Sequence, residues 1–389
     1  MARRPMGAII AAGILTSVAT PVLGQAPVLR SANHDYRVVT VADGLIHPWG
    51  MAFLPGGDVL ITERPGRLRL VRQGTLRMAP VEGVPQVFYE GQGGLLDVVL
   101  HPEFEENQLI YLTYSKPIGD GTEGTTAVAR GRWVNDRLAD VEDIFVAETR
   151  GRPGHYGARL AFDADGYLFV TVGERQVAST GDLSAHPAQD NSNHHGTVNR
   201  LHDDGKVPSD NPFVGKRDAR PEIWSYGHRN PQGLAIHPET GDVWAVEHGP
   251  QGGDELNRVL PGLNYGWPVI GYGVNYTTGL AIHEGTQGEG IESPTHFWVP
   301  SIATSGLMIY SGDLFPAWKG SVFVGGLAGE QIARLTMDGQ RVVREEAILE
   351  GRGRVRDIRQ SPDGYVYVAI DPRDEEPTSV VRLEPAGAR

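Results

Sequence analysis

The chain has 389 residues, of which 40% are hydrophobic and 21% are charged, a composition typical of a soluble globular protein. Its formal net charge of −13 at pH 7 argues against nucleic acid as a partner, because binding to phosphate requires a basic surface. The absence of cysteine excludes disulfides, cysteine-linked haem, iron–sulfur clusters and thiolate zinc sites.

The N-terminal segment has the pattern of a secretory signal. A basic start is followed by an apolar run over residues 9–18 and then by small residues. Because this run is short for a bilayer span, a cleaved signal is preferred to a membrane anchor. We expect cleavage near Gly24 or Ala26, which removes residues 1–24 and leaves residues 25–389 as one periplasmic domain with no membrane span.

A short pattern recurs six times after the signal: an apolar residue, a turn containing Pro, Asp or Gly, and a run of β-branched and aromatic residues. The six patterns begin at Phe53, Leu100, Phe162, Ile236, Phe315 and Ser361. Each predicts a strand–turn–strand unit. Repeats spaced by about 45 to 80 residues predict an all-β fold, a six-bladed β-propeller with four-stranded antiparallel blades. The alternative is an open β-sandwich with coincidental turns.

Polar loops follow several of these strands. Glu174 comes after a strand that ends at Val172, and the charged segment 247–257 comes after Val246. A propeller brings equivalent strand ends together around its axis on one face. We therefore expect residues that are distant in the sequence to meet in one central pocket.

His155 lies among small residues immediately before the third repeat. A histidine in such a position can be exposed and can titrate near neutral pH, which suits a general base. The alternative is a hydrogen-bonded histidine with a purely structural role.

Residues 226–268 are rich in Gly, Pro, Asn and charged side chains, as functional loops often are. Arg229 supplies a cation for an anionic ligand. The carbonyl groups of Gly249 and Pro250 lie close in the sequence to Asp254, and calcium binds oxygen ligands of both kinds. Because no EF-hand spacing is present, this composition is only a weak calcium signal.

Two arginines precede the sixth repeat. Arg354 and Arg356 stand at alternate positions of a predicted strand, so they are expected on the same face. In an acidic protein, such a pair indicates a bound anion, for example a carboxylate. The alternative is ordinary surface ion pairing with Asp357 and its neighbours.

Taken in order, these motifs resemble the soluble glucose/sorbosone dehydrogenase family, and most closely its quinoprotein aldose sugar dehydrogenases. The resemblance spans about residues 36–385 and rests on the segments His47–Phe53, Thr62–Arg67, Gly91–Asp97, Gly227–Leu234, Gly249–Asn257 and Arg354–Asp357. It implies a six-bladed propeller that binds pyrroloquinoline quinone (PQQ) and Ca2+ on its axis. It also implies oxidation of the C1 hydroxyl of an aldose to a lactone, with hydride transfer to PQQ and electrons passed to an external acceptor.

The resemblance also implies roles for matching residues. The implied cofactor contacts are Gln92, His155, Glu174, Arg229, Asn230, Arg354 and Arg356. The implied catalytic residues are His155 as general base, Arg229 near the reactive carbonyl, and Asp254 as an acid that tunes the base. The backbone oxygens of Gly249 and Pro250 would hold the catalytic calcium, and Glu255 and Tyr265 a second, structural calcium.

Two departures from the family pattern keep other functions open. Glu174 stands where the family commonly has Asp, and Ala328 stands where some glucose-oxidising members have a cofactor-binding Lys. The second departure favours the broader aldose branch. One alternative is a calcium-dependent propeller lactonase in which His155 activates water, although it has no use for clustered arginines. Another is a non-catalytic sugar-binding propeller that has lost its cofactor.

Overall fold

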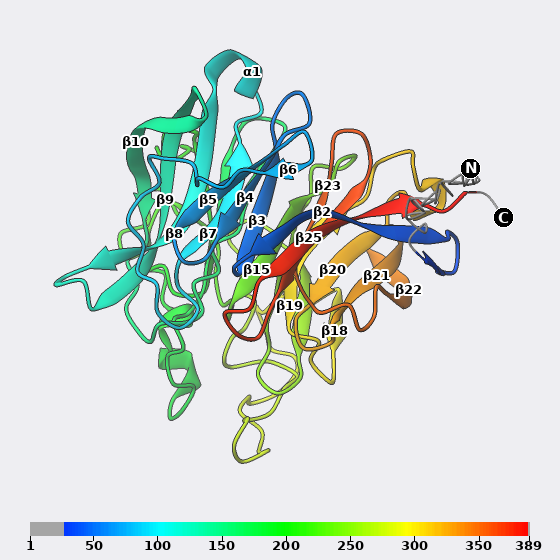
Figure 1. Ribbon diagram of the computed structural model, residues 1–389. Helices are drawn as coiled ribbons and strands as arrows, with labels where there is room; N and C mark the ends of the chain where they lie inside the picture. The colour runs from blue at the N-terminus through cyan, green and yellow to red at the C-terminus, as the bar shows by residue number, and fades with distance from the viewer. Residues whose placement is uncertain (1–26, 388–389) are drawn as a thin grey trace, which may run out of the picture.

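The computed structural model describes residues 27–387, and the signal predicted over residues 1–24 lies outside them. The described strands form six small antiparallel sheets, the blades (Figure 1), and contacts between neighbouring blades close them into a ring. The predicted six-bladed, all-β propeller is therefore confirmed.

The first five blades each contain four consecutive strands. Blade 1 contains β3 (Pro48–Phe53), β4 (Val59–Glu63), β5 (Arg67–Arg72) and β6 (Thr75–Leu76). Blade 2 contains β7 (Leu95–Leu100), β8 (Leu109–Ile118), β9 (Glu123–Val134) and β10 (Arg137–Val146). Blade 3 contains β11 (Leu160–Phe162), β12 (Leu168–Val172), β13 (Thr197–Leu201) and β14 (Ile223–Ser225). Blade 4 contains β15 (Pro231–Ile236), β16 (Val243–Glu247), β17 (Asp254–Arg258) and β18 (His296–Trp298). Blade 5 contains β19 (Thr304–Ile309), β20 (Val322–Gly326), β21 (Gln331–Asp338) and β22 (Arg341–Ile348).

Blade 6 joins the two ends of the described chain. It contains β23 (Arg354–Gln360), β24 (Val366–Asp371), β25 (Thr378–Pro385), β2 (Tyr36–Leu45) and β1 (Val28–Leu29). β25 pairs with β2 in antiparallel fashion. Because β1 adds a strand at the outer edge, blade 6 has five strands where four were predicted. The first strands of adjacent blades contact one another all the way around, which closes the ring.

Helical structure is minor in the described residues. It comprises α1 (Phe104–Asn107) and the short 3-10 helices η1 (Leu183–Ala185), η2 (Pro187–Gln189) and η3 (Pro316–Trp318). None of these helices is long and apolar enough to cross a bilayer.

The repeated turns connect the first and second strands of a blade. In blade 1, Phe53 pairs with Val59 across a turn in which Gly56 and Gly57 both have φ of 91°, a conformation that glycine adopts without strain. These turns lie at the far end of the innermost strands. The residues that begin the innermost strands therefore share the opposite face of the ring.

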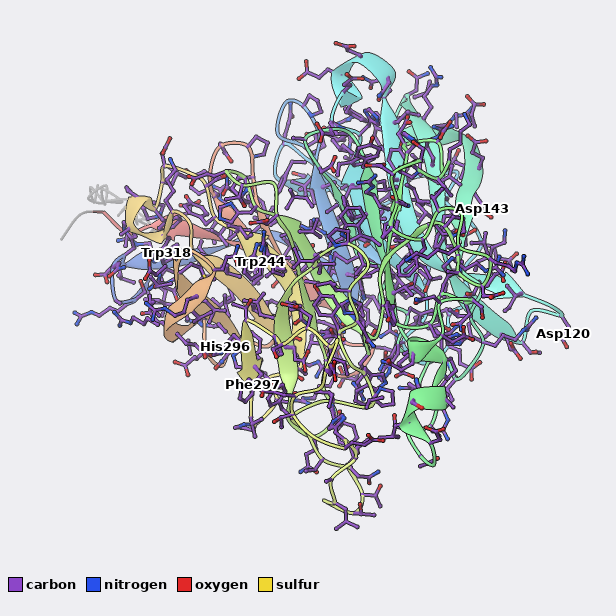
Figure 2. The ribbon with its side chains drawn as sticks, turned by 180° about the vertical axis from the view of Figure 1, so that it is seen from behind. Asp120, Asp143, Trp244, His296, Phe297 and Trp318 are labelled. Carbon is purple, nitrogen blue, oxygen red and sulfur yellow. The ribbon has the colours of Figure 1, made fainter. Side chains whose placement is uncertain are left out.

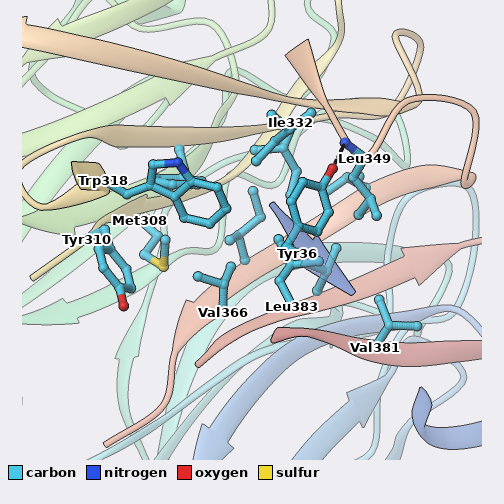
Figure 3. Packing of buried hydrophobic residues seen from close by; sticks show 14 of the residues in the cluster. Tyr36, Met308, Tyr310, Trp318, Ile332, Leu349, Val366, Val381 and Leu383 are labelled. Atoms are coloured by element: carbon cyan, nitrogen blue, oxygen red, sulfur yellow. Dashed lines mark hydrogen bonds between the residues drawn. The ribbon is translucent and has the colours of Figure 1, made fainter. Parts of the chain in front are cut away.

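The core lies between neighbouring blades. Between blades 5 and 6, Tyr36, Trp318 and Leu383 are almost completely buried (Figure 3). The Leu349 N–H donates to the Tyr36 hydroxyl at 2.9 Å, so the polar end of this tyrosine is also satisfied. Burial of each such side chain contributes about 1.5–3 kcal/mol. This packing fixes the blades and holds a site on the axis rigidly.

Five innermost strands show register irregularities at their first residues, namely β3, β7, β15, β19 and β23. A bulge bends the strand locally and changes the direction of its side chains. In β23 the irregularity lies between Val355 and Asp357, within the predicted arginine pair. The backbone is therefore irregular at the face where polar residues were expected to meet.

Candidate active site

Two adjoining cavities lie where the innermost strands begin. The first, which we call the cation cavity, has a volume of about 340 Å³ and is lined by His47, Arg64, Gln92, Gln232, His248, Arg354, Arg356, Asp371 and Arg373, among others. The second, the base cavity, has a volume of about 630 Å³ and is lined by Gln92, His155, Glu174, Arg229, Asn230, His248, Pro250, Trp267 and Tyr276, among others. Gln92 and His248 border both cavities. The lining residues come from all parts of the chain, as convergence on the axis predicts. A further cavity of about 550 Å³ lies among the turns at the opposite end and has no comparable cluster of cations.

Arginines dominate the cation cavity. The predicted pair, Arg354 and Arg356, lines it together with Arg64 and Arg373. Burial, and then the nearby Arg356, lower the pKa of both Arg64 and Arg354. Burial and the repulsion from Arg356 both disfavour the charged forms of these guanidinium groups, and a bound anion would offset both effects. The cavity is therefore suited to an anionic ligand.

Arg356 is held in place by two polar partners. Its Nη2 donates to Asp371 Oδ2 at 2.7 Å, and its Nη1 donates to Gln232 Oε1 at 2.7 Å. Asp371 also bonds to Nδ1 of His47 at 2.7 Å. Burial would raise the pKa of Asp371, but Arg356 and His47 lower it overall, so its carboxylate stays charged. The alternative pairing with Asp357 is not formed: Asp357 binds Arg159 and Arg359 instead.

His155 lines the base cavity and contacts Glu174. Its Nδ1 is hydrogen-bonded to Glu174 Oε1, and Glu174 Oε2 accepts the Val177 N–H at 2.7 Å. The extra methylene of Glu174 therefore does not prevent contact with the histidine. His155 is only 7% exposed, so it is less open than its small neighbours suggested.

The charges around His155 favour a neutral ring. Burial, and then Arg229, lower the pKa of His155, whereas Glu174 acts in the opposite direction. The pKa of Glu174 is lowered as well: burial raises it, but the hydrogen bond from His155 and the positive charge of Arg229 and other neighbours together outweigh burial. Since a carboxylate can only accept, Nδ1 carries the proton. Nε2 is then an unprotonated nitrogen at pH 7, as a general base requires.

Gln92 and Asn230 fix the backbone around the histidine. Gln92 Oε1 accepts the His155 N–H at 2.9 Å, and Asn230 Oδ1 accepts the Gly157 N–H at 3.0 Å. Both side chains also border the base cavity. Their observed contacts therefore position His155, in addition to any contact with a ligand.

Arg229 lies across the base cavity over an indole ring. Its guanidinium carbon is 5.0 Å from the ring centroid of Trp267. Its backbone N–H donates to Glu247 Oε2 at 2.5 Å, and its Nη1 donates to the His248 carbonyl at 3.1 Å. The guanidinium is thus fixed in orientation and retains donors for a ligand.

Four buried nitrogens at the cavities have no hydrogen-bond partner in the described part of the chain. They are Nε of Arg229, Nε of Arg354, Nε2 of His248 and Nε1 of Trp267. An unsatisfied buried polar group costs about 1–3 kcal/mol. A ligand that brings several carbonyl and carboxylate oxygens would satisfy these nitrogens and neutralise the arginines. The residues present therefore fit a polyanionic quinone such as PQQ.

Asp254 is placed beneath the Gly249 turn. Its Oδ1 accepts the Gly249 N–H at 2.9 Å, and both carboxylate oxygens accept from the Ser301 hydroxyl at 2.8 Å. Burial raises the pKa of Asp254. No hydrogen bond joins Asp254 to His155 among the residues described, and the carboxylate at the histidine is that of Glu174. The contacts of Asp254 thus support the turn that presents the Gly249 and Pro250 carbonyls.

Glu255 and Tyr265 lie together beside Glu247. Glu247 and Glu255 pair across β16 and β17, and Asn257 Nδ2 donates to both carboxylates, at 3.0 and 3.2 Å. Burial, and then Glu247, raise the pKa of Glu255 well above its usual range. The Tyr265 hydroxyl is already bonded to the Arg258 carbonyl at 2.6 Å. Residues 27–387 contain no group of three or more His, Asp or Glu side chains placed to hold one metal ion.

Several residues of the cation cavity were not predicted from the sequence, namely His47, Arg64, Gln232, His248, Asp371 and Arg373. Each lies at the start of an innermost strand or at the end of a second strand. Arg64 follows β4, His248 follows β16, and Asp371 ends β24. Because the second strand runs back to the same face, reading both strand ends in every blade would have found them.

Comparison with known proteins agrees with this geometry. The family model for glucose/sorbosone dehydrogenase matches residues 45–382. The aldose sugar dehydrogenase YliI of Escherichia coli is 42% identical over 90% of this chain and 94% of its own length. The crystal structure of the soluble aldose sugar dehydrogenase of Escherichia coli in the apo form superposes with a TM-score of 0.84, at 40% identity over 90% of this chain and 99% of that one.

A second solved structure is the PQQ-bound aldose sugar dehydrogenase of Streptomyces coelicolor. It has a TM-score of 0.72 and 29% identity, over 90% of this chain and 98% of that one. The fold, the arrangement of the cavities and these matches agree with one another. The chain belongs to the glucose/sorbosone dehydrogenase family of oxidoreductases.

Proposed function

We propose that this protein oxidises the C1 hydroxyl of aldose sugars to lactones by hydride transfer to PQQ, with calcium bound beside the quinone. The observation that carries the proposal is a neutral histidine held by a carboxylate next to clustered arginines with unpaired donors. A hydrolase needs the histidine but not the arginines. An inert binding protein needs neither.

The chain contributes the proton transfer. Glu174 accepts the Nδ1 proton of His155 and so leaves Nε2 to remove the proton of the sugar hydroxyl. Arg229, fixed over Trp267, stabilises the negative charge that develops beside it. PQQ, when bound, supplies the two-electron acceptor for the C1 hydrogen, and calcium supplies a Lewis acid.

Named residues would hold the cofactor and the cation. Arg354 and Arg356 would bind quinone carboxylates. Arg64 and Arg373 would supply further positive charge, because Ala328 stands in place of the cofactor-binding Lys of some family members. The Gly249 and Pro250 carbonyls would hold the catalytic calcium. A second calcium would lie between Glu247 and Glu255, where it would relieve their repulsion. The Tyr265 hydroxyl already donates to the Arg258 carbonyl, so Tyr265 would bind this calcium through its backbone carbonyl.

The proposed setting is the periplasm, after removal of residues 1–24 as a signal. The support is the basic and apolar N-terminal pattern of the sequence. N-terminal sequencing of protein from a periplasmic extract tests this. A mature chain that begins near residue 25 is expected, whereas an intact Met1 in the cytoplasm would contradict export.

Dye reduction tests the reaction. Purified full-length protein is mixed with PQQ and Ca2+, an aldose is added, and reduction of a neutral phenazine-coupled dye is followed. Turnover is expected only with PQQ, Ca2+ and sugar together, and the product should be the lactone. Cleavage of a lactone without PQQ would instead establish a hydrolase, and sugar binding with neither reaction would establish a binding protein.

A further inference from the structure

The segment from residue 259 to residue 318 contains no Lys or Arg. An even distribution of the chain's 35 basic residues would place about five there, so the depletion is a local feature and not only a consequence of the acidic net charge. Three glutamates, Glu284, Glu289 and Glu292, lie in the same stretch. Glu284 and Glu289 are exposed, and within residues 27–387 none of the three forms an ion pair. They therefore present unneutralised negative charge.

The same segment exposes apolar side chains. Tyr276, Leu280, Phe297 and Val299 are 67%, 68%, 44% and 61% exposed, and they make up four of the eleven large hydrophobic residues exposed on the described chain. The ring of Phe297 stacks on Tyr272 with centroids 4.0 Å apart. Exposed apolar groups set among charges of one sign are typical of an interaction surface.

These residues belong to one lobe, residues 264–299. Its loops project beyond the blades at the bottom of Figure 1, and its last part includes β18 of blade 4. Isolated bridges tie it together, including Asn264 to Ile291 and Ile270 to Gly285. Phe297 and His296, labelled in Figure 2, lie on β18 at the base of the projecting loops. The acids and the apolar residues are therefore parts of one structural unit.

The lobe adjoins the candidate active site directly. The Tyr276 hydroxyl donates to the Gly249 carbonyl at 3.4 Å, and Gln251 is bridged to Val274. Asn275, Tyr276 and Ile282 form one wall of the base cavity. A partner seated on the lobe would therefore stand at the mouth of the site.

We propose that the 264–299 lobe docks a small redox protein with a basic face, which takes the electrons released at the site. This rests on the proposed function. Each aldose oxidised to a lactone releases two electrons and two protons, so a one-electron haem acceptor is reduced twice per sugar, and the protons pass to solvent. A cationic partner complements the glutamates, whereas a second copy of this acidic chain would meet like charge.

A basic cytochrome c is the probe. The test variant carries Glu284→Gln, Glu289→Gln and Glu292→Gln. The matched control carries Glu103→Gln, Glu105→Gln and Glu106→Gln, which removes the same charge at α1 on the far end of the molecule (Figure 1). Cytochrome reduction is measured at increasing salt, with aldose and PQQ-loaded protein, and the neutral phenazine dye serves as a second acceptor.

At low salt, the second-order rate constant for cytochrome c should fall about tenfold in the lobe variant and remain unchanged in the control. Added salt should remove the difference, and dye reduction should be the same in all three proteins. Leu280→Ser with Val299→Ser should weaken cytochrome binding at every salt concentration. Equal cytochrome rates in the lobe variant and the control would overturn the docking proposal while leaving the dehydrogenase intact.

If dye reduction itself fails, a binding measurement tests the docking surface independently of the proposed dehydrogenase activity. Calorimetric titration of basic cytochrome c into the full chain needs no turnover. Binding that the lobe substitutions abolish and the control preserves would support the surface even without the reaction. Absence of binding, or a concentration-dependent dimer that buries the lobe in sedimentation, would refute it.

Discussion

Three properties meet at His155: a carboxylate on Nδ1, burial, and a nearby guanidinium. Glu174 sets the tautomer, and burial together with the charge of Arg229 lowers the pKa of the ring and keeps it neutral. We predict that His155→Ala lowers kcat about 10²- to 10⁴-fold, the usual contribution of a general base, while PQQ still binds. The measurements are dye reduction and PQQ titration on the same preparation.

The control for this substitution is His237→Ala. His237 accepts the Glu239 N–H in a turn on the opposite face, so its loss should leave kcat unchanged. Loss of PQQ binding in His155→Ala, with normal turnover per bound cofactor, would contradict the role as base.

The pH dependence of kcat/KM is also expected to depend on His155 and Glu174. His155 acts unprotonated, and its pKa is lowered from the ordinary 6.5, so activity should be full above pH 6.5 and decline below it. Glu174 raises this pKa. Glu174→Gln should therefore move the acid limb to lower pH, while the amide oxygen can still accept from Nδ1. A limb that stays in place or moves upward would show that another group controls the profile.

Among the structural elements, the turn from Gly249 to Gly253 depends on one buried acid. Asp254 accepts from the Gly249 N–H and from Ser301, so it fixes the carbonyls that are proposed to bind calcium. We predict that Asp254→Asn raises the Ca2+ concentration for half-maximal activity about 10- to 100-fold, as loss of a supporting partner typically does. A calcium titration of dye reduction measures it.

Asp242→Asn is the matched control. Asp242 precedes β16 at the opposite end of the same strand and pairs with Arg258 at 2.7 Å. Its replacement should leave the calcium requirement unchanged. If Asp254→Asn also left the Ca2+ concentration for half-maximal activity unchanged, the turn supported by Asp254 would not be part of the calcium site.

The strands and turns could be predicted from neighbouring residues in the sequence. The contacts between blades could not. The turn at Phe53 depends on adjacent residues and was confirmed. Arg354 and Arg356, also close in the sequence, line the same cavity. Glu174 was found through its motif, and its bond to His155 joins residues 19 apart. The pairing of Arg356 with Gln232 joins residues 124 apart and depends on the angle between blades, which no local pattern encodes.

At the scale of the whole molecule, the ring is closed by β2 and β25. The six repeats predicted the number of blades, but not which N-terminal strand completes the last one, because that pairing spans nearly the whole chain. Arg37 lies opposite Glu384 in this pair. Since the chain contains no cysteine, one engineered disulfide there has no competing thiol.

We predict that Arg37→Cys with Glu384→Cys stabilises the oxidised protein by about 2–4 kcal/mol, because the cross-link closes a very long loop. Val134→Cys with Arg137→Cys, which face each other across a hairpin of blade 2, closes a short loop and should give much less. Thermal unfolding with and without reductant measures both. Equal gains from the two cross-links would argue against closure by β2 and β25.

The central claim is that the arginines at the hub bind a polyanionic quinone. Its most direct test is an equilibrium titration of the full chain with PQQ and Ca2+, followed through quenching of Trp49 and Trp267, which border the two cavities. The account predicts one saturable site per chain, and binding at least tenfold weaker in Arg354→Ala with Arg356→Ala than in the surface control Arg341→Ala. No saturable binding, or equal affinity in both variants, would contradict it.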